Sequence, residues 1–550
     1  MQQLRIRGFR FVFSGVLIGL LSLALDFGGS RVCAEDAVGD SGKRPQVTLP
    51  PESYFAKVRE KDREAARAFY KKFIDIGGLA CTAGADVADA ALIRTHEIVT
   101  HMLADRPDIL QAMADNGTRL IIIGKDQVYT DMPEYRNHPN PEFQNERVRG
   151  TGGFDVTSFG EENLLNLALD RYDDESIAVH EFCHTIDAAL RRIDKTWSER
   201  MTSVYRNAVE QGRYKFAYAG SNAGEYWAEI AQAYFDCNRV NNWNHSAIGT
   251  REQLKDYDPE GYELVRETFK LSPQNDWRFS PMQKQPSVIE PPAKFAFPEF
   301  YTKFTWAREF PVLGSAKVNE EAMLIANDTI RKMFAYRHDL LKVLINDKAR
   351  VVVLAKGERL TDLPEFADER EQARPAMARH FDYTADKKVI VVPEENLLGG
   401  TADPAAGRCL LVGQMAKAVY TVAAAREVDE RYLTVRRDSQ QYEQRLIWDK
   451  SSERIPRMDM QFDVRMREVF AEAAQRGLWK GTPAARSPVE YWATGVEAYF
   501  DAAGLGYPPV DAPRPVTNRE ELKAYDPALF KMVDETMLYD GHQDWRYRRK

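Results

Sequence analysis

Two histidines in the first half of the chain are spaced to bind one metal ion. They lie in the segment His180-Glu181-Phe182-Cys183-His184, an H-E-x-x-H motif inside a predicted helix. Positions four apart share one face of a helix, so both imidazoles can bind the same ion while Glu181 takes a proton from a water on it. The motif therefore predicts a Zn²⁺ site with His180 and His184 as ligands and Glu181 as general base.

The third ligand is expected from a separate helix, because a catalytic zinc ion takes three protein ligands and a water. Residues 225–229 offer two carboxylates four positions apart, and we expect Glu225 to bind the metal. Glu229 then accepts a hydrogen bond from a ligating histidine, and Asp187, one turn after His184, is a second candidate for that role. The alternative is that Glu225 only stabilises the start of its helix.

Hydrophobic spacing predicts the elements that position these residues. Residues 176–192 and 223–238 have the pattern of amphipathic helices, and residues 92–113 also have helical spacing. Residues 119–124 are a short β-branched run typical of a strand. The glycine-rich segment 149–153 lacks the strand-to-helix context of a phosphate-binding loop, so we interpret it as a flexible loop. The predicted fold class is α+β.

Blocks of sequence recur in the same order along the chain, which indicates a duplicated domain. The blocks at 161–165, 225–228 and 233–236 return at 394–398, 490–493 and 498–501.

The repeat sets the predicted domain bounds. After an N-terminal segment at 1–34 we predict a catalytic domain at 35–280, a Pro-rich linker at 281–294 and a repeat domain at 295–550. The second copy carries an insertion in the charged stretch after Arg426. Each copy is long enough to fold around its own core.

The chemical residues together resemble a known family. The H-E-x-x-H motif with Asp187, followed by Tyr218 and then Glu-Tyr-Trp-Ala-Glu at 225–229, is similar to the catalytic domain of anthrax toxin lethal factor and its relatives, zinc metallopeptidases of the gluzincin type. The resemblance covers mainly residues 118–277 and, weakly, the repeat. It does not include the toxin's receptor-binding or cell-entry portions.

This resemblance implies two tandem zincin-like metallopeptidase domains, the second without the zinc motif. It implies that His180, His184 and Glu225 bind Zn²⁺, that Glu181 is the general base, and that Tyr218 donates a hydrogen bond to the oxyanion.

The second copy has lost most of these groups. The counterparts in the two copies are His180 and Gly413, Glu181 and Gln414, His184 and Lys417, Tyr218 and Pro483. We therefore expect the second domain to bind no zinc and to act as scaffold, docking surface or regulator. Glu490 persists at the Glu225 position whereas Thr494 replaces Glu229, so the internal comparison alone favours Glu229 as third ligand.

The expected function is hydrolysis of peptide bonds by a zinc-activated water, with a peptide or protein as substrate. A peptide is expected to pair with the strand at 119–124, with segment 149–153 as a rim. The alternative is a non-catalytic, metal-retaining binding protein built from two peptidase-like domains. Retention of Tyr218 with the complete motif favours the enzyme.

Composition narrows the class of protein. Hydrophobic residues make up 44% of the chain, which excludes wholesale disorder, and a net charge of -8 argues against nucleic acid or an anionic membrane as main partner. Oligomeric state is not indicated. Five cysteines form no disulfide framework, and we expect Cys81 and Cys237 to be unbridged although an exported protein allows such a bond.

The N-terminus predicts export. Three arginines precede an apolar run at 11–25, and small residues follow at the position that a signal peptidase recognises. We predict a signal peptide at 1–34 cleaved after Ala34, a secreted or periplasmic protein, and no stable membrane insertion after cleavage.

Overall fold

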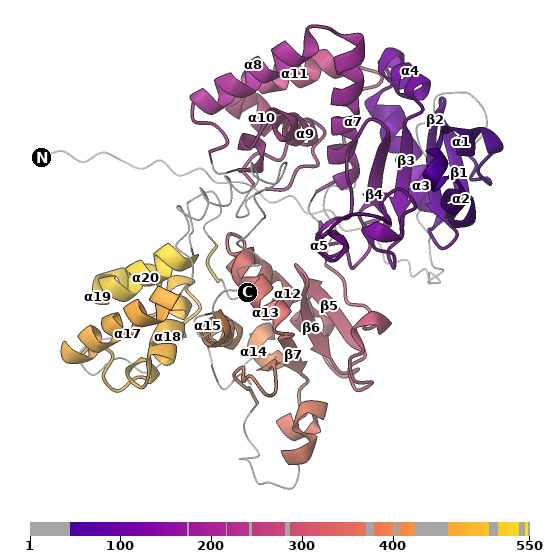
Figure 1. Cartoon of the computed structure of the whole chain (residues 1–550). Coiled ribbons are helices and arrows are strands. Elements are labelled where there is room, and N and C mark those ends of the chain that lie inside the picture. The colour runs from indigo at the N-terminus through magenta and orange to yellow at the C-terminus, as the bar shows by residue number, and fades with distance from the viewer. Residues whose placement is uncertain are drawn as a thin grey trace, which may run out of the picture. The chain divides into compact units, whose positions relative to one another are not determined.

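The structure is a computed structural model (Figure 1). It describes residues 45–172, 175–215, 217–240, 245–280, 286–369, 379–399, 403, 405, 407–423, 460–504, 515–537 and 545–547. The predicted signal peptide, the start of the predicted linker at 281–285 and the insertion after Arg426 lie outside these ranges. Within them, no helix combines the length and the apolar character that crossing a membrane requires.

A four-stranded mixed sheet organises the first half. Its strands, in spatial order, are β1 (Tyr70–Ile76), β2 (Leu79–Gly84), β3 (Arg119–Ile123) and β4 (Val156–Gly160). β1 and β2 are antiparallel, whereas β3 runs parallel to both β2 and β4. β4 is therefore an edge strand beside the helices that carry the motif.

β3 lies in the middle of this sheet. Leu120 and Ile122 pack into the core on one face, and Ile121 and Ile123 pack on the other, which explains the unbroken apolar run. Both edges of β3 are hydrogen-bonded to neighbouring strands. The expectation that a peptide pairs with residues 119–124 is therefore wrong, because this strand has no free edge.

Helices cover the sheet and build the rest of the first half. They are α1 (Glu52–Lys57), α2 (Glu60–Phe69), α3 (Asp89–Met102), α4 (Pro107–Asn116), η1 (Tyr129–Asp131), α5 (Pro141–Arg147), α6 (Glu161–Leu164), α7 (Ile177–Ile193), α8 (Trp197–Glu210), η2 (Tyr218–Gly220), α9 (Ala223–Tyr234), α10 (Arg251–Tyr257) and α11 (Pro259–Phe269). The single helix predicted at 92–113 is two helices, because Pro107 cannot continue a helix and instead begins α4.

α7 and α9 are the two helices predicted to carry the site, and capping residues set where they begin. The Ser176 hydroxyl accepts a hydrogen bond from the Val179 N–H, at 3.3 Å, and the Asn222 side chain accepts one from the Glu225 N–H, at 2.9 Å. The buried Trp227 of α9 donates its indole N–H to the Cys183 carbonyl of α7, at 2.8 Å. This last contact holds the two helices against each other.

The second half contains a sheet of the same order. Its strands are β5 (Lys303–Ala307), β6 (Phe310–Gly314), β7 (Arg350–Leu354) and β8 (Val389–Pro393), with β5 and β6 antiparallel and the other pairs parallel. Its helices include η3 (Ala293–Phe295), α12 (Glu320–Met333), α13 (His338–Asn346), η4 (Leu360–Asp362), η5 (Pro364–Glu369), α14 (Glu394–Leu398), α15 (Leu410–Ala423), α17 (Met460–Gln475), η7 (Pro483–Ala485), α18 (Pro488–Tyr499), α19 (Arg519–Tyr525) and α20 (Pro527–Met537).

The α+β class predicted from the sequence is confirmed, since each half combines a small mixed sheet with many helices. The domain bounds stay a prediction. Cys81, Cys183, Cys237 and Cys409 are buried and free, so Cys81 and Cys237 are not bridged in the structure.

Candidate metal centre

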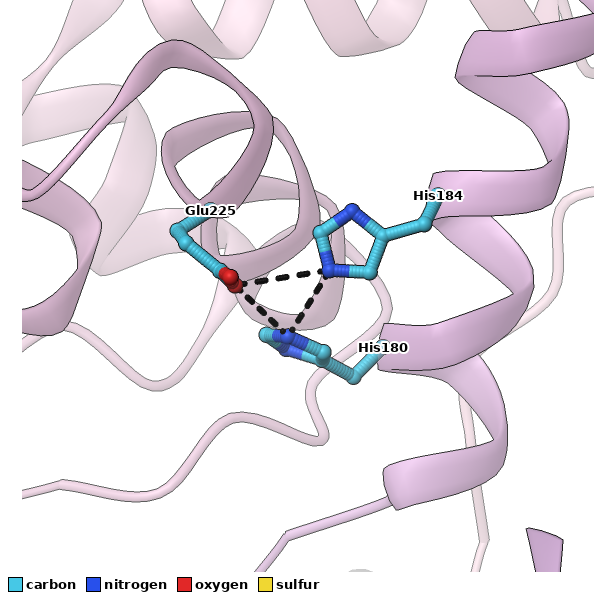
Figure 2. A group of neighbouring side chains, drawn as sticks. All are labelled: His180, His184 and Glu225. Atoms are coloured by element: carbon cyan, nitrogen blue, oxygen red, sulfur yellow. Dashed lines mark hydrogen bonds and ion pairs between the residues drawn. The ribbon is translucent and has the colours of Figure 1, made fainter. Parts of the chain in front are cut away.

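Three ligating atoms from α7 and α9 converge (Figure 2). The His180 Nε2 lies 3.1 Å from the Glu225 Oε2 and 3.3 Å from the His184 Nε2, and the His184 Nε2 lies 3.4 Å from the Glu225 Oε2. Ligands about 2.0–2.1 Å from a tetrahedral zinc ion are about 3.3 Å apart, so the three separations fit that ion. Two imidazoles and one carboxylate are also a donor set that zinc accepts in catalytic sites.

Gln232 orients the first histidine. Its amide N–H donates to the Ser176 carbonyl at 3.0 Å, which leaves its Oε1 to accept from the His180 Nδ1, 2.8 Å away. The Nδ1 therefore carries a proton, and the Nε2 is the nitrogen that faces the other ligands and would have to be unprotonated to bind a metal.

The sequence interpretation gave this role to Glu229, and that assignment is wrong. The Glu229 Oε1 is 3.7 Å from the Nδ1 of His180, beyond hydrogen-bond range. Gln232 lies two turns after Glu225 on the same face of α9, and this spacing is the pattern that would have found it.

Asp187 does not serve as the expected alternative. Its carboxylate accepts a hydrogen bond from the Trp197 indole at 2.7 Å and from the Arg191 guanidinium at 3.0 Å. Asp187 thus anchors the start of α8 against α7.

Glu181 sits beside the ligand cluster. The pKa of its carboxyl is raised, mainly because the group is buried and also because Glu225 is close. The two histidines and a hydrogen bond from the Gly152 N–H offset part of this rise. A raised pKa makes the carboxylate a better proton acceptor than an exposed glutamate. For Glu225, burial also acts to raise the pKa, but hydrogen bonds from both histidines outweigh it and lower the pKa, so this group is a carboxylate.

Tyr218 is brought to the same place. Its ring stacks on the His180 ring, with centroids 6.1 Å apart and planes 26° apart. Burial raises the pKa of its hydroxyl well above the ordinary value, and the charge of Glu225 raises it further. The side chain is therefore a neutral phenol that can donate a hydrogen bond.

The glycine-rich segment 149–153 packs directly on the motif. A Cβ at Gly152 would lie 2.5 Å from the Glu181 carbonyl oxygen and 2.5 Å from the His184 Cβ, so only glycine fits. The neighbouring Thr151 exchanges backbone hydrogen bonds with Ser158 of β4, at 3.2 and 2.9 Å. This segment was expected to be a flexible rim, but its glycines allow close packing against α7 and β4.

The corresponding place in the second half holds side-chain ion pairs. The Lys417 Nζ lies 2.8 Å from the Glu490 Oε1 and 2.9 Å from the Asp382 Oδ2. Arg408 pairs with both oxygens of the buried Glu497, at 2.7 and 2.8 Å.

Comparison of the chain with models of protein families, with curated proteins and with solved structures finds no match.

Proposed function

We propose that this chain is an exported zinc-dependent metallopeptidase with two tandem zincin-like domains, of which only the first is catalytic. The convergence of His180, His184 and Glu225 beside a buried glutamate carries the proposal. Its substrate is a peptide or protein, and it is secreted or periplasmic.

Each residue then has a role in hydrolysis. His180, His184 and Glu225 would hold a zinc ion, which would supply Lewis acidity and lower the pKa of the attacking water. The Glu181 carboxylate takes the proton of the attacking water and passes it to the leaving amine. The Tyr218 hydroxyl donates a hydrogen bond to the oxyanion that forms at the attacked carbonyl.

Substitution of the general base tests the proposal. We expect Glu181→Gln to lower the cleavage of a diverse peptide mixture by about 10²–10⁴-fold while zinc content is unchanged, because the amide cannot accept the proton. Mass spectrometry of the products and metal analysis measure both effects. The matched control is Glu210→Gln, the same change at an exposed position on α8.

Two outcomes would contradict the enzyme. Undiminished cleavage by a zinc-loaded Glu181→Gln variant would show that Glu181 is not the general base. Zinc binding with no cleavage by the unaltered chain would instead favour the alternative function, a non-catalytic, metal-retaining binding protein.

A further inference from the structure

A second group of ligating side chains lies at the opposite ring nitrogen of His180. It consists of Glu175, Glu229 and His245, and one ligand atom from each lies within 4.8 Å of the others. The His245 Nε2 is 3.4 Å from the Glu229 Oε1 and 3.9 Å from the Glu175 Oε2. Two atoms bound to one tetrahedral zinc ion at 2.0–2.2 Å are about 3.3–3.6 Å apart, so the first distance fits a shared ion and the second would have to shorten by a few tenths of an ångström.

Three separate segments supply these side chains. Glu175 precedes the capping residue of α7, Glu229 lies within α9, and His245 follows α9 in the chain. The side chains are only 5%, 4% and 6% exposed, respectively. A cluster with two carboxylates is therefore held out of water, where negative charge is costly unless a cation accompanies it.

The outer oxygens of both carboxylates already have partners. Asn238 donates to the Glu229 Oε2 at 3.2 Å, and the Arg239 guanidinium lies 3.4 Å from the Glu175 Oε1. The inner oxygens are the ones turned toward His245. Among the residues that the structure describes, the buried Glu229 Oε1 makes no hydrogen bond of good geometry, and its polar neighbours are the ring nitrogens of His245 at 3.4 Å and His180 at 3.7 Å, so a strong acceptor points into the cluster.

We propose that Glu175, Glu229 and His245 bind a second divalent metal ion of the zinc class. One imidazole nitrogen and two carboxylate oxygens are ligands that zinc accepts, and an ion there would satisfy the Glu229 Oε1. The ion would tie the start of α7, the middle of α9 and the segment at His245 together. This site goes beyond the peptidase proposed above, because it requires no catalysis and none of the three ligands of the first centre.

The second half of the chain shows what replaces such a site. Aligned on the repeat, Glu175 corresponds to Arg408 and Glu229 to Thr494. Arg408 pairs with Glu497, the counterpart of Gln232. In the second half, a permanent side-chain cation therefore stands at the sequence position of one acidic side chain and pairs with the residue at the Gln232 position.

Zinc content of the full chain tests the second site. The protein is stripped with a chelator, reloaded with Zn²⁺, dialysed and analysed by mass spectrometry for metal per chain. We expect about two zinc ions in the unaltered chain and about one in His245→Ala, in Glu175→Gln and in His184→Ala. The double variant His184→Ala/His245→Ala is expected to hold none.

A conservative variant and a control variant distinguish loss of the metal from loss of the fold. Glu175→Gln keeps the size of the side chain while removing its charge, and circular dichroism checks the fold of each variant. His96→Ala on α3 is the matched histidine control and should keep about two ions.

The outcomes separate this site from the catalytic one. Zinc content that is unchanged in both His245→Ala and Glu175→Gln overturns the second site, whatever the total. A single ion lost only in His184→Ala leaves the first site alone. A single ion that is lost only in His245→Ala and Glu175→Gln supports the second site. It would also show that the first centre binds no zinc, which contradicts the proposed peptidase.

Discussion

The motif helix α7 and its counterpart α15 differ in what neutralises their acidic surroundings. In α7, His180 and His184 face Glu225 with the spacing of zinc ligands. In α15, the Lys417 ammonium lies between Glu490 and Asp382. A glutamate persists at the same position in both halves, but in the first half it faces two histidines and in the second half it faces the ammonium of Lys417.

The position of His180 also differs between the two helices. Gly413 stands where His180 stands in the first half, and a Cβ there would overlap the Glu497 side chain. Glu497 is held by Arg408, so the space of the missing imidazole is filled by an ion pair. Restoring a single histidine in the second half would therefore not restore a site, because the surrounding residues have changed with it.

The strongest test transfers one residue between the halves. We expect His184→Lys to abolish peptide cleavage and to lower zinc content by about one ion per chain, because the ammonium would pair with Glu225 as Lys417 pairs with Glu490. Metal analysis and the peptide assay measure this change. The control is His96→Lys, and zinc content equal to the control would show that the two helices are not comparable.

A smaller effect is expected at the residue that orients His180. Gln232→Ala should weaken zinc binding at the first centre by about 10–100-fold, because the imidazole loses the acceptor that fixes its tautomer. Competition with a chelator of known affinity measures the change. Gln211→Ala, at an exposed position after α8, is the control. An unchanged affinity would mean that Gln232 does not orient the ligand.

The second half is tested through its stability. Gly413→Ala should lower the free energy of unfolding by about 1–3 kcal/mol, because the added methyl group overlaps the buried Glu497. Urea unfolding measures this loss, with Thr421→Ala at an exposed position of α15 as control. In the double variant with Glu497→Ala the two losses should not add, since removing Glu497 relieves the overlap. Strict additivity would contradict this packing.

The smallest expected effect is a dependence of peptide cleavage on pH. It arises from Glu181, which can titrate, whereas its counterpart Gln414 in the second half cannot. Burial raises the pKa of Glu181, and only its carboxylate form accepts a proton, so kcat/KM falls as the pH falls through that raised pKa. The acid limb should lie above the value of about 4.3 at which an ordinary glutamate titrates. Zinc content measured at each pH shows whether metal is still bound. An acid limb at or below the ordinary value would contradict the assigned base.

Local patterns in the sequence predicted the helices better than the partners of the site. The spacing of His180 and His184 and the apolar periodicity placed α7 and α9, since helix geometry depends on neighbours in the chain. Gln232 and His245 were missed because their importance depends on which side chains meet after folding.

The wrong expectations for β3 and for the segment 149–153 also concern contacts between distant parts of the chain. The apolar run of β3 indicates a buried strand, but its sequence does not show that β4 lies outside it. The need for glycine at position 152 likewise follows from the approach of its segment to α7, a contact between distant parts of the chain.

The hydrogen bond from the Trp227 indole to the Cys183 carbonyl has a consequence for metal loading. It joins α7 to α9 through buried groups outside the candidate metal centre, so the protein core positions His180, His184 and Glu225. A chelator should then produce a folded, reloadable apoprotein, in contrast to zinc fingers, which unfold when the metal leaves. Metal exchange at the first centre would be a local event, reversible without refolding the chain.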